Sequence, residues 1–179
     1  MKMKSLIMPV VAIGLSALIL LGASMGLSAS AKANQQQARY DLMCSLLPGN
    51  TSFEEEVYEG EDDAIRAVYK GENGYVIETS TYGYAGDVVM LIGVDNSGCV
   101  TGLTVLDLAE TYGLGARVLA DMDFLSQFVG MAGEAEIGST VDAMTGATVT
   151  SKAITKGVNA ASAYVTGADT SSSATEWGG

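Results

Sequence analysis

The sequence predicts an α+β fold: a single N-terminal transmembrane helix, followed by one domain in which helices flank an antiparallel β-sheet. Three observations lead to this prediction. Residues 5–31 contain no charged side chain, residues 64–106 contain two pairs of strand-like segments joined by turn residues, and residues 150–166 have helical periodicity. The chain of 179 residues is long enough for one domain and an anchor.

The first predicted element is the apolar segment between Lys4 and Lys32. As a helix it would be about 40 Å long, which is enough to cross the hydrocarbon core of a bilayer. Lys2 and Lys4 favour a cytoplasmic N-terminus, with the rest of the chain outside the cytoplasm. The alternative is a cleaved signal peptide, because Ala29-Ser30-Ala31 has the small residues of a cleavage site. The length of the apolar segment favours a retained anchor, residues 1–32, in the cell membrane.

A helix over residues 34–47 comes next, because its apolar residues lie near one face and Pro48-Gly49 ends it. It continues from the anchor, so residues 33–49 are assigned to a juxtamembrane helix. The following segment, Phe53 to Asp63, is strongly acidic and is expected to be a solvated surface stretch.

Two β-hairpins are predicted in the middle of the chain. Residues 64–69 and 75–79 flank the turn at residues 70–74. Residues 88–94 and 100–106 flank a turn of Asp95, Asn96, Ser97 and Gly98. The second pair is almost continuously apolar, which predicts strands buried on both faces or nearly so.

Two helices complete the predicted domain, residues 50–166. A short helix is expected at about residues 121–128, before Gly130, and a long one is expected to begin near Thr150 or Ser151. The long helix has an apolar stripe that consists of Ile154, Val158, Ala161 and Val165. Candidate caps for it are the hydroxyls of Thr148, Thr150 and Ser151. Residues 167–179 are expected to form a flexible tail.

Composition excludes several classes of function. The net charge of −12 argues against nucleic-acid binding, and the absence of histidine removes the triads that depend on it and the commonest transition-metal ligand. Cys44 and Cys99 form no CxxC pair; they are either one disulfide or two unrelated thiols. No catalytic residue and no metal ligand is assigned, so redox chemistry in this chain would require a bound cofactor.

The segment from Asp142 to Ser151 contains the residues most informative about function. Gly146 and Ala147 are small enough for a bulky group to approach the backbone closely. Thr148 presents a hydroxyl just before a predicted helix, where free amides and the helix dipole favour a phosphate. Asp142 is expected either to cap the turn or to help hold a metal ion during modification. Taken alone, these residues favour an ordinary threonine-rich loop and helix cap over a phosphate site.

Asp142, Thr145, Gly146, Ala147 and Thr148 match the flavinylation motif D-x-x-[ST]-G-A-[TS], so the chain resembles the family of FMN-binding domains found in RnfG and NqrC. The resemblance implies that a flavin transferase, using FAD and magnesium, esterifies the Thr148 hydroxyl to the phosphate of FMN. It also implies that Thr145, Gly146 and Ala147 shape the loop and that Asp142 is needed for modification. The phosphate or ribityl chain would be contacted by Thr150, Ser151 and Lys152.

A second segment, residues 110–115, is similar to the E-T-P-G-L-G loop of the same family. Its glycines allow main-chain atoms to lie against a flat ring, although a glycine-rich turn that closes a strand is also possible. The resemblance makes candidate ring contacts of Glu110, Thr111, Gly113, Leu114 and Gly115. Tyr112 replaces the family's proline, which puts the rigidity of the loop in question.

The resemblance implies a one-electron relay with no substrate chemistry of its own. The implied protein is the G component of an Rnf-type ion-translocating ferredoxin:NAD oxidoreductase, with FMN covalently bound on the extracytoplasmic side. Its implied partners are the lipid bilayer, the other Rnf components (A, B, C, D and E) and the flavin transferase. A free-standing membrane-anchored FMN carrier and a non-redox exported binding module are the alternatives.

Overall fold

The computed structural model describes residues 33–84, 86–108 and 121–168. The chain divides into two units, Met1–Asp41 and Leu42–Gly179. A helix predicted at residues 34–47 is observed at residues 33–46, with a hydrogen bond between the Gln37 and Asp41 side chains one turn apart. Within the described residues no helix has both the length and the apolar character needed to cross a membrane. The predicted anchor, residues 1–32, lies outside those residues.

The second unit contains a five-stranded antiparallel sheet whose strands lie in chain order. These are β1 (Glu54–Glu56), β2 (Ile65–Lys70), β3 (Gly74–Tyr82), β4 (Asp87–Asp95) and β5 (Val100–Leu108). Both predicted hairpins are confirmed, as β2 with β3 and β4 with β5. The central strands β3 and β4 pair along their whole length, from Gly74 with Asp95 to Tyr82 with Asp87. The α+β class is therefore confirmed.

Strand β1 was missed by the sequence reasoning, which placed its residues in a solvated acidic stretch. The exposure was predicted correctly, because Glu54 and Glu55 are exposed and Glu56 is half-buried. The backbone nevertheless pairs with the edge of β2, and Lys70 Nζ lies 3.0 Å from Glu56 Oε1 across that pair. Charged side chains pointing to solvent are compatible with an edge strand, because only its backbone has to join the sheet.

Burial of the second hairpin differs between its two strands. Val88, Met90, Leu91, Ile92 and Val94 of β4 are fully buried, as predicted. In strand β5, residues 101–105 are only half-buried, and Leu106 is 39% exposed. The prediction of burial on both faces is therefore wrong for β5. Since β5 has a strand neighbour on one side only, its apolar residues gain less cover.

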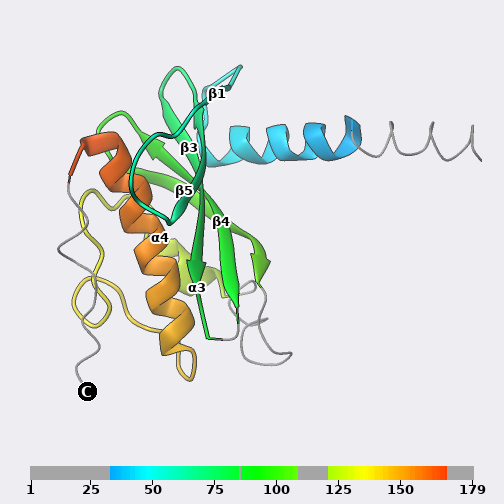
Figure 1. Ribbon diagram of the computed structural model, residues 1–179. Helices are drawn as coiled ribbons and strands as arrows, with labels where there is room; N and C mark the ends of the chain where they lie inside the picture. Colours follow the sequence, from blue (N-terminus) through cyan, green and yellow to red (C-terminus); the bar gives the residue numbers. More distant parts are fainter. Residues whose placement is uncertain (1–32, 85, 109–120, 169–179) are drawn as a thin grey trace, which may run out of the picture. The chain divides into compact units, whose positions relative to one another are not determined.

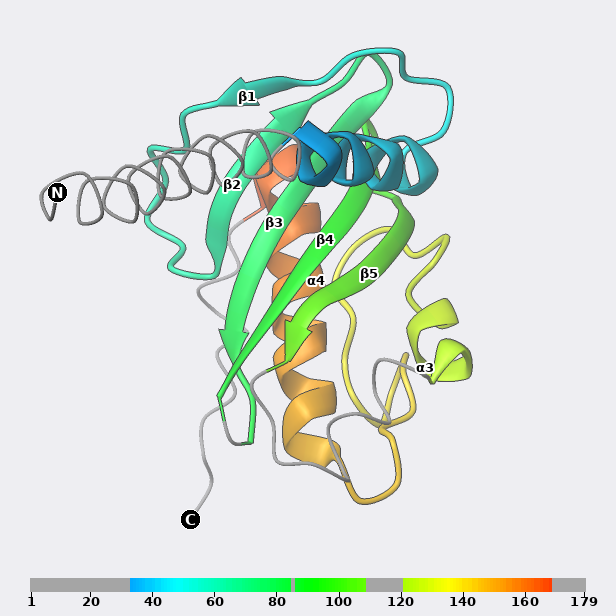
Figure 2. The ribbon, with the colours of Figure 1, turned by 90° about the vertical axis from the view of Figure 1, so that its right-hand side faces the viewer.

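One face of the sheet is covered by helix α4 (Thr148–Thr166), as Figures 1 and 2 show from two directions. The predicted stripe is confirmed at Ile154, Val158 and Ala161, which are at most 1% exposed. The helix approaches β3 and β4 closely at Gly157, where an added Cβ would lie 2.5 Å from Met90 Cε. Thr81 Oγ1 in β3 donates a 2.8 Å hydrogen bond to Ala153 O and so joins β3 to the second turn of α4.

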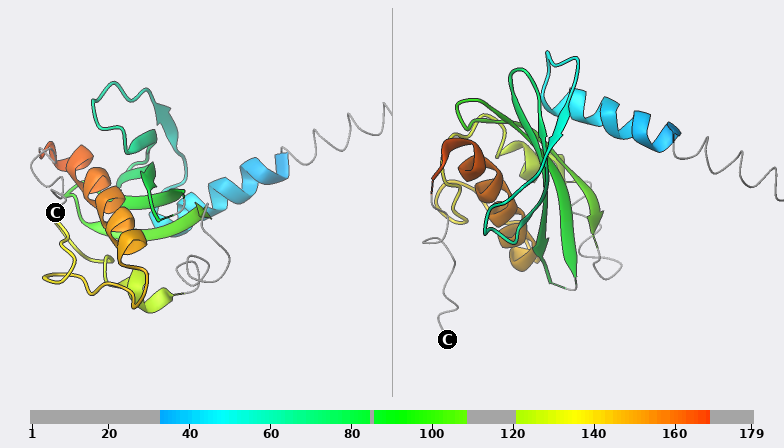
Figure 3. Two further views of the ribbon diagram at one scale, coloured as in Figure 1. Left: turned by 60° about the horizontal axis from the view of Figure 1, so that its bottom comes forward. Right: turned by 45° about the horizontal axis from the view of Figure 1, so that its top comes forward.

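The predicted short helix is α3 (Met122–Ser126), and it packs beside β5 (Figure 3). Asp121 caps it by accepting a 3.0 Å hydrogen bond from Phe124 N, as expected for an aspartate at this position. Phe124 and Phe128 pack edge to face at 5.3 Å between ring centroids and are buried. This helix leads into the loop that precedes α4.

A pair of glycines lies on the sheet face opposite α4. Gly93 of β4 is the register partner of Gly102 of β5, and the backbone of Leu46 packs against both. Thr101 Oγ1 donates a 2.5 Å hydrogen bond to Leu46 O. Met43, Leu46 and Leu47 are buried here. Residues 42–47 therefore pack on the sheet through apolar contacts and through the hydrogen bond from Thr101.

The turn between β4 and β5 is organised by Asp95. Its carboxylate accepts hydrogen bonds from Ser97 Oγ, Ser97 N and Cys99 N. These bonds hold the pKa of Asp95 below its ordinary value, and the bond from the Ser97 hydroxyl contributes most.

Of the two alternatives for the cysteines, the structure has free thiols at both Cys44 and Cys99.

Candidate functional site

The loop before α4 ends in a tight turn from Met144 to Ala147. Ala147 N donates a 3.1 Å hydrogen bond to Met144 O, and Gly146, the third residue, has a φ of +80°. A type II turn requires a positive φ at this position, which glycine adopts without strain. Thr145 and Gly146 are consequently exposed at the tip, and the chain enters α4 directly afterwards.

Ser151 connects both ends of this turn from inside the domain. Its hydroxyl accepts a 3.1 Å hydrogen bond from Met144 N and donates a 3.0 Å bond to Ala147 O. The residue has no exposed surface. Ser151 therefore supports the turn and does not cap the helix, and it has no surface available to a ligand.

Helix α4 begins at Thr148, two residues earlier than the nearer predicted start. Its N-cap residue is Ala147, and no side chain caps it. The prediction that a hydroxyl of Thr148, Thr150 or Ser151 caps the helix is therefore wrong. Thr150 and Ser151 lie within the helix at buried positions, and Thr148 is its first helical residue.

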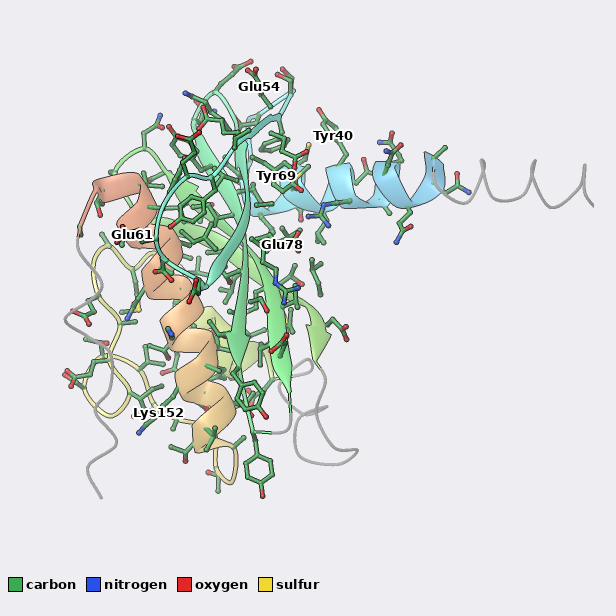
Figure 4. The ribbon with its side chains drawn as sticks, viewed as in Figure 1. Tyr40, Glu54, Glu61, Tyr69, Glu78 and Lys152 are labelled. Atoms are coloured by element: carbon green, nitrogen blue, oxygen red, sulfur yellow. The ribbon has the colours of Figure 1, made fainter. Side chains whose placement is uncertain are left out.

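Thr148 is exposed at the first position of α4. The amides of Thr148 and Val149 are in the first turn of α4, where no earlier helical carbonyl can accept their hydrogen bonds. The first turn contains no acidic residue. Lys152, four residues after Thr148 and therefore on the same face of the helix, is exposed, and Figure 4 shows it near the start of α4. An exposed hydroxyl, free amides, the positive end of the helix dipole and a cation fit a phosphate group joined to Thr148.

Gln127 was not predicted to belong to the site. Its side-chain amide holds the backbone of Asp142 in both directions: Asp142 N donates to Gln127 Oε1 at 2.9 Å, and Gln127 Nε2 donates to Asp142 O at 3.4 Å. Because the two residues are fifteen positions apart, no local spacing rule would connect them. The Asp142 carboxylate is exposed and makes no hydrogen bond to the described residues, so it does not cap the turn.

The second predicted segment, with Glu110, Thr111, Gly113, Leu114 and Gly115, lies outside the described residues. The strand that leads into it ends near the start of α4. Leu108 of β5 pairs with Val88, and Val88 pairs with Thr81, which is bonded to α4. The end of β5 and the first turns of α4 therefore lie at the same end of the sheet (Figures 1 and 2).

Replacing Ser151 by alanine is expected to lower the free energy of unfolding by about 1–3 kcal/mol, because the buried Met144 amide loses its acceptor. Urea unfolding of the purified protein measures this change. Lys156→Ala is the matched control on the exposed face of the same helix and should stay within about 0.5 kcal/mol of the parent. Equal losses in the two variants would contradict the role given to Ser151.

Comparison with known proteins identifies a cofactor domain in this part of the chain. The family model of the FMN-binding domain matches residues 83–163, from the turn between β3 and β4 almost to the end of α4. Those residues include the turn before α4 and Thr148.

Three relatives have related names, each that of the G subunit of a complex. The chain is 38% identical over 113 residues to the G subunit of the Na(+)-translocating ferredoxin:NAD(+) oxidoreductase complex of Acetobacterium woodii, an alignment that covers about half of each chain, 54%. It is 32% identical over 151 residues to the G subunit of the ion-translocating oxidoreductase complex of Methanosarcina acetivorans, with 76% of this chain and 80% of the relative covered. The G subunit of the proton-translocating ferredoxin:NAD(+) oxidoreductase complex of Clostridium ljungdahlii is 34% identical over 145 residues, with 76% of each chain covered.

Proposed function

The chain belongs to the RnfG family, the FMN-binding G subunits of ion-translocating oxidoreductase complexes, and from this premise we propose that it relays electrons through FMN attached covalently to Thr148. The observation that supports the attachment most directly is the exposed Thr148 hydroxyl on an uncapped helix N-terminus. Gly146 and Ser151 hold the preceding turn so that this hydroxyl is presented to solvent.

The attachment is a group transfer with FAD as donor and a separate flavin transferase as catalyst. Thr148 Oγ1 forms a new bond to the phosphorus that bears riboflavin, while the pyrophosphate bond of FAD breaks. AMP leaves, and the hydroxyl proton passes to a base of the transferase or to water. Asp142 presents an exposed carboxylate six residues before Thr148, where it can assist the magnesium ion of that reaction.

When bound, FMN supplies reversible acceptance and donation of single electrons. The residues of this chain hold it. Amides of the first turn of α4 would bind the phosphate, and Lys152 would offset its charge. Residues 110–115, which follow β5 in the sequence, would contact the ring. The acidic surface, with a net charge of −12 for the chain, disfavours additional negative charge on the reduced ring.

The proposal includes the location of the protein. Residues 1–32 anchor it in the cell membrane, residues 33–49 follow as a juxtamembrane segment whose helix ends at residue 46, and residues 50–166 form the FMN domain outside the cytoplasm, before the tail at residues 167–179. The partners are the other subunits of an Rnf-type complex, and the electrons pass between ferredoxin and NAD, as the names of two relatives state for those proteins. Coupling to ion movement belongs to the assembled complex.

The test is to produce the full chain together with a flavin transferase and to denature the purified product. We expect yellow, fluorescent protein after removal of small molecules, with the mass of the polypeptide plus FMN less one water. The bound flavin should be bleached by dithionite and recover in air. Flavin that is released on denaturation would disprove the covalent bond, and protein that never acquires flavin would disprove the proposed cofactor site.

A further inference from the structure

A groove of about 350 Å³ lies at the other end of α4 from Thr148. One wall is the loop after β1, which contributes Val57, Tyr58, Glu59 and Asp62, and the other is the last turns of α4, which contribute Tyr164. Figure 4 shows Glu61, on the same loop, near the later turns of α4, whereas Lys152 lies near its start. From Thr148 to Tyr164 the helix rises about 24 Å, so the groove is separate from the flavin site.

The aromatic floor of the groove is preorganised. Tyr58 and Tyr164 pack edge to face with 5.9 Å between ring centroids, and Tyr75 also packs edge to face against Tyr164, at 5.6 Å. The loop curls around the Tyr58 ring: Asp62 N donates to the Tyr58 hydroxyl at 3.1 Å, and Gly60 leaves no room for a Cβ beside that ring. Because these rings are already held in place, binding of a partner does not incur the entropic cost of ordering them.

The electrostatic environment of the groove favours a cation in three ways. Seven of the eleven residues from Phe53 to Asp63 are acidic and none is basic. The α4 helix ends at the groove with no basic residue in its last turn, so the negative end of its dipole has no cation of its own helix. Aromatic faces also attract cations.

The nearby cation of the described domain is already engaged. Lys70 Nζ lies 3.0 Å from Glu56 Oε1 and 5.8 Å from the centre of the Tyr75 ring, outside the groove. Glu56 also accepts a 3.3 Å hydrogen bond from the Tyr164 hydroxyl, and burial together with the Glu56 charge raises the pKa of that hydroxyl. Tyr164 therefore stays neutral, and the Glu56 carboxylate is already paired with Lys70 and Tyr164. This leaves the Glu59 carboxylate, which lines the groove, to interact with an incoming group.

We propose that this groove is a docking site for a lysine-bearing basic segment of another subunit of the complex. The lysine ammonium lies between Glu59, the Tyr58 ring and the terminal carbonyls of α4, and the lysine stem packs along Val57, which is 86% exposed. A compact ammonium with three donors suits acceptors that come from several directions. The inference relies on the proposed function only for the existence of partner subunits.

The chain's own C-terminal segment is the competing occupant, because Gly167 and Ala168 line the groove and residues 169–179 follow them. That segment contains Asp169 and Glu176 and no Lys or Arg. Its charge has the same sign as that of the groove, so complementarity favours a basic partner.

The test uses cell membranes that contain the complete complex with the full-length chain. A carbodiimide joins a carboxylate to an amine in contact with it by removing water, and linked peptides are identified by mass spectrometry. We expect Glu59 to be linked to a lysine of another subunit and Glu59→Gln to lose that link. We also expect Glu59→Lys to lower co-purification of the other subunits about tenfold. Asp123→Lys, the same charge change on α3, should leave co-purification unchanged.

Covalent flavin is measured on the same samples by fluorescence of the denatured chain. Glu59→Lys should keep its flavin, which separates failure of docking from failure of the proposed function. A Glu59 link to this chain itself, no link to another subunit, or equal co-purification of Glu59→Lys and Asp123→Lys would each overturn the docking site.

Discussion

Thr148→Val is expected to yield a folded protein that contains no covalently bound flavin. Valine has nearly the shape of threonine but no hydroxyl, so no ester can form at this position. Because Thr148 is exposed at the first turn of α4, its replacement should change the free energy of unfolding by no more than about 0.5 kcal/mol. The measurements are intact mass, fluorescence of the denatured protein and thermal unfolding, after co-production with the flavin transferase.

Thr148→Ser is the matched control, since serine keeps the hydroxyl and fits the flavinylation motif. It should gain the same mass as the parent protein. If Thr148→Val still carries flavin after denaturation, the attachment is at another residue. If Thr148→Ser remains unmodified while the parent is modified, the methyl group of threonine is needed in addition to the hydroxyl.

Gly93→Ala is expected to lower the free energy of unfolding by about 2–4 kcal/mol. The added Cβ would overlap Leu46 O, and it would lie 2.7 Å from Thr101 Oγ1 and 2.8 Å from Leu46 C. Two of these atoms belong to the backbone, so no side-chain rotation can relieve the overlap. Residues 42–47 would have to move off the sheet, with loss of the hydrogen bond from Thr101 to Leu46 and of the contacts of buried Leu47.

Gly102→Ala tests whether close approach to Leu46 decides this effect. Gly102 is the register partner of Gly93, yet its added Cβ would come no closer than 3.3 Å to Leu46. We expect a loss about half that of Gly93→Ala or less, from urea unfolding of the full chain in detergent. Similar losses in both variants would mean that glycine is needed here for a reason shared by the two strands.

Much of the fold was predictable because its signals are local. The Asp95 to Gly98 turn and the apolar segments around it determine a hairpin within about twenty residues, and the stripe of Ile154, Val158 and Ala161 determines the buried face of α4. Strand β1 was not predictable in this way. Its acidic side chains indicate solvent correctly, but its pairing depends on an edge of β2 that exists only once the sheet has formed.

The candidate site was predictable in its motif but not in its supports. The match of residues 142–148 to the family's flavinylation motif singled out Thr148 as the attachment residue, and that assignment stays a prediction. The roles of Ser151 and Gln127 depend on a buried hydroxyl that faces back towards a turn and on an amide from a distant helix end. A hydroxyl near a helix start has several possible partners, and only the folded backbone selects one of them.

Helix α4 has a consequence for how the protein is used. It is one continuous helix. The proposed flavin attachment is at its first residue, and the proposed docking groove is at its last turns, about 24 Å away. A partner segment bound in the groove therefore contacts the protein about 24 Å from Thr148 and leaves the first turn of α4 to the electron donors and acceptors. Attachment to a partner subunit and transfer of electrons would therefore use opposite ends of α4.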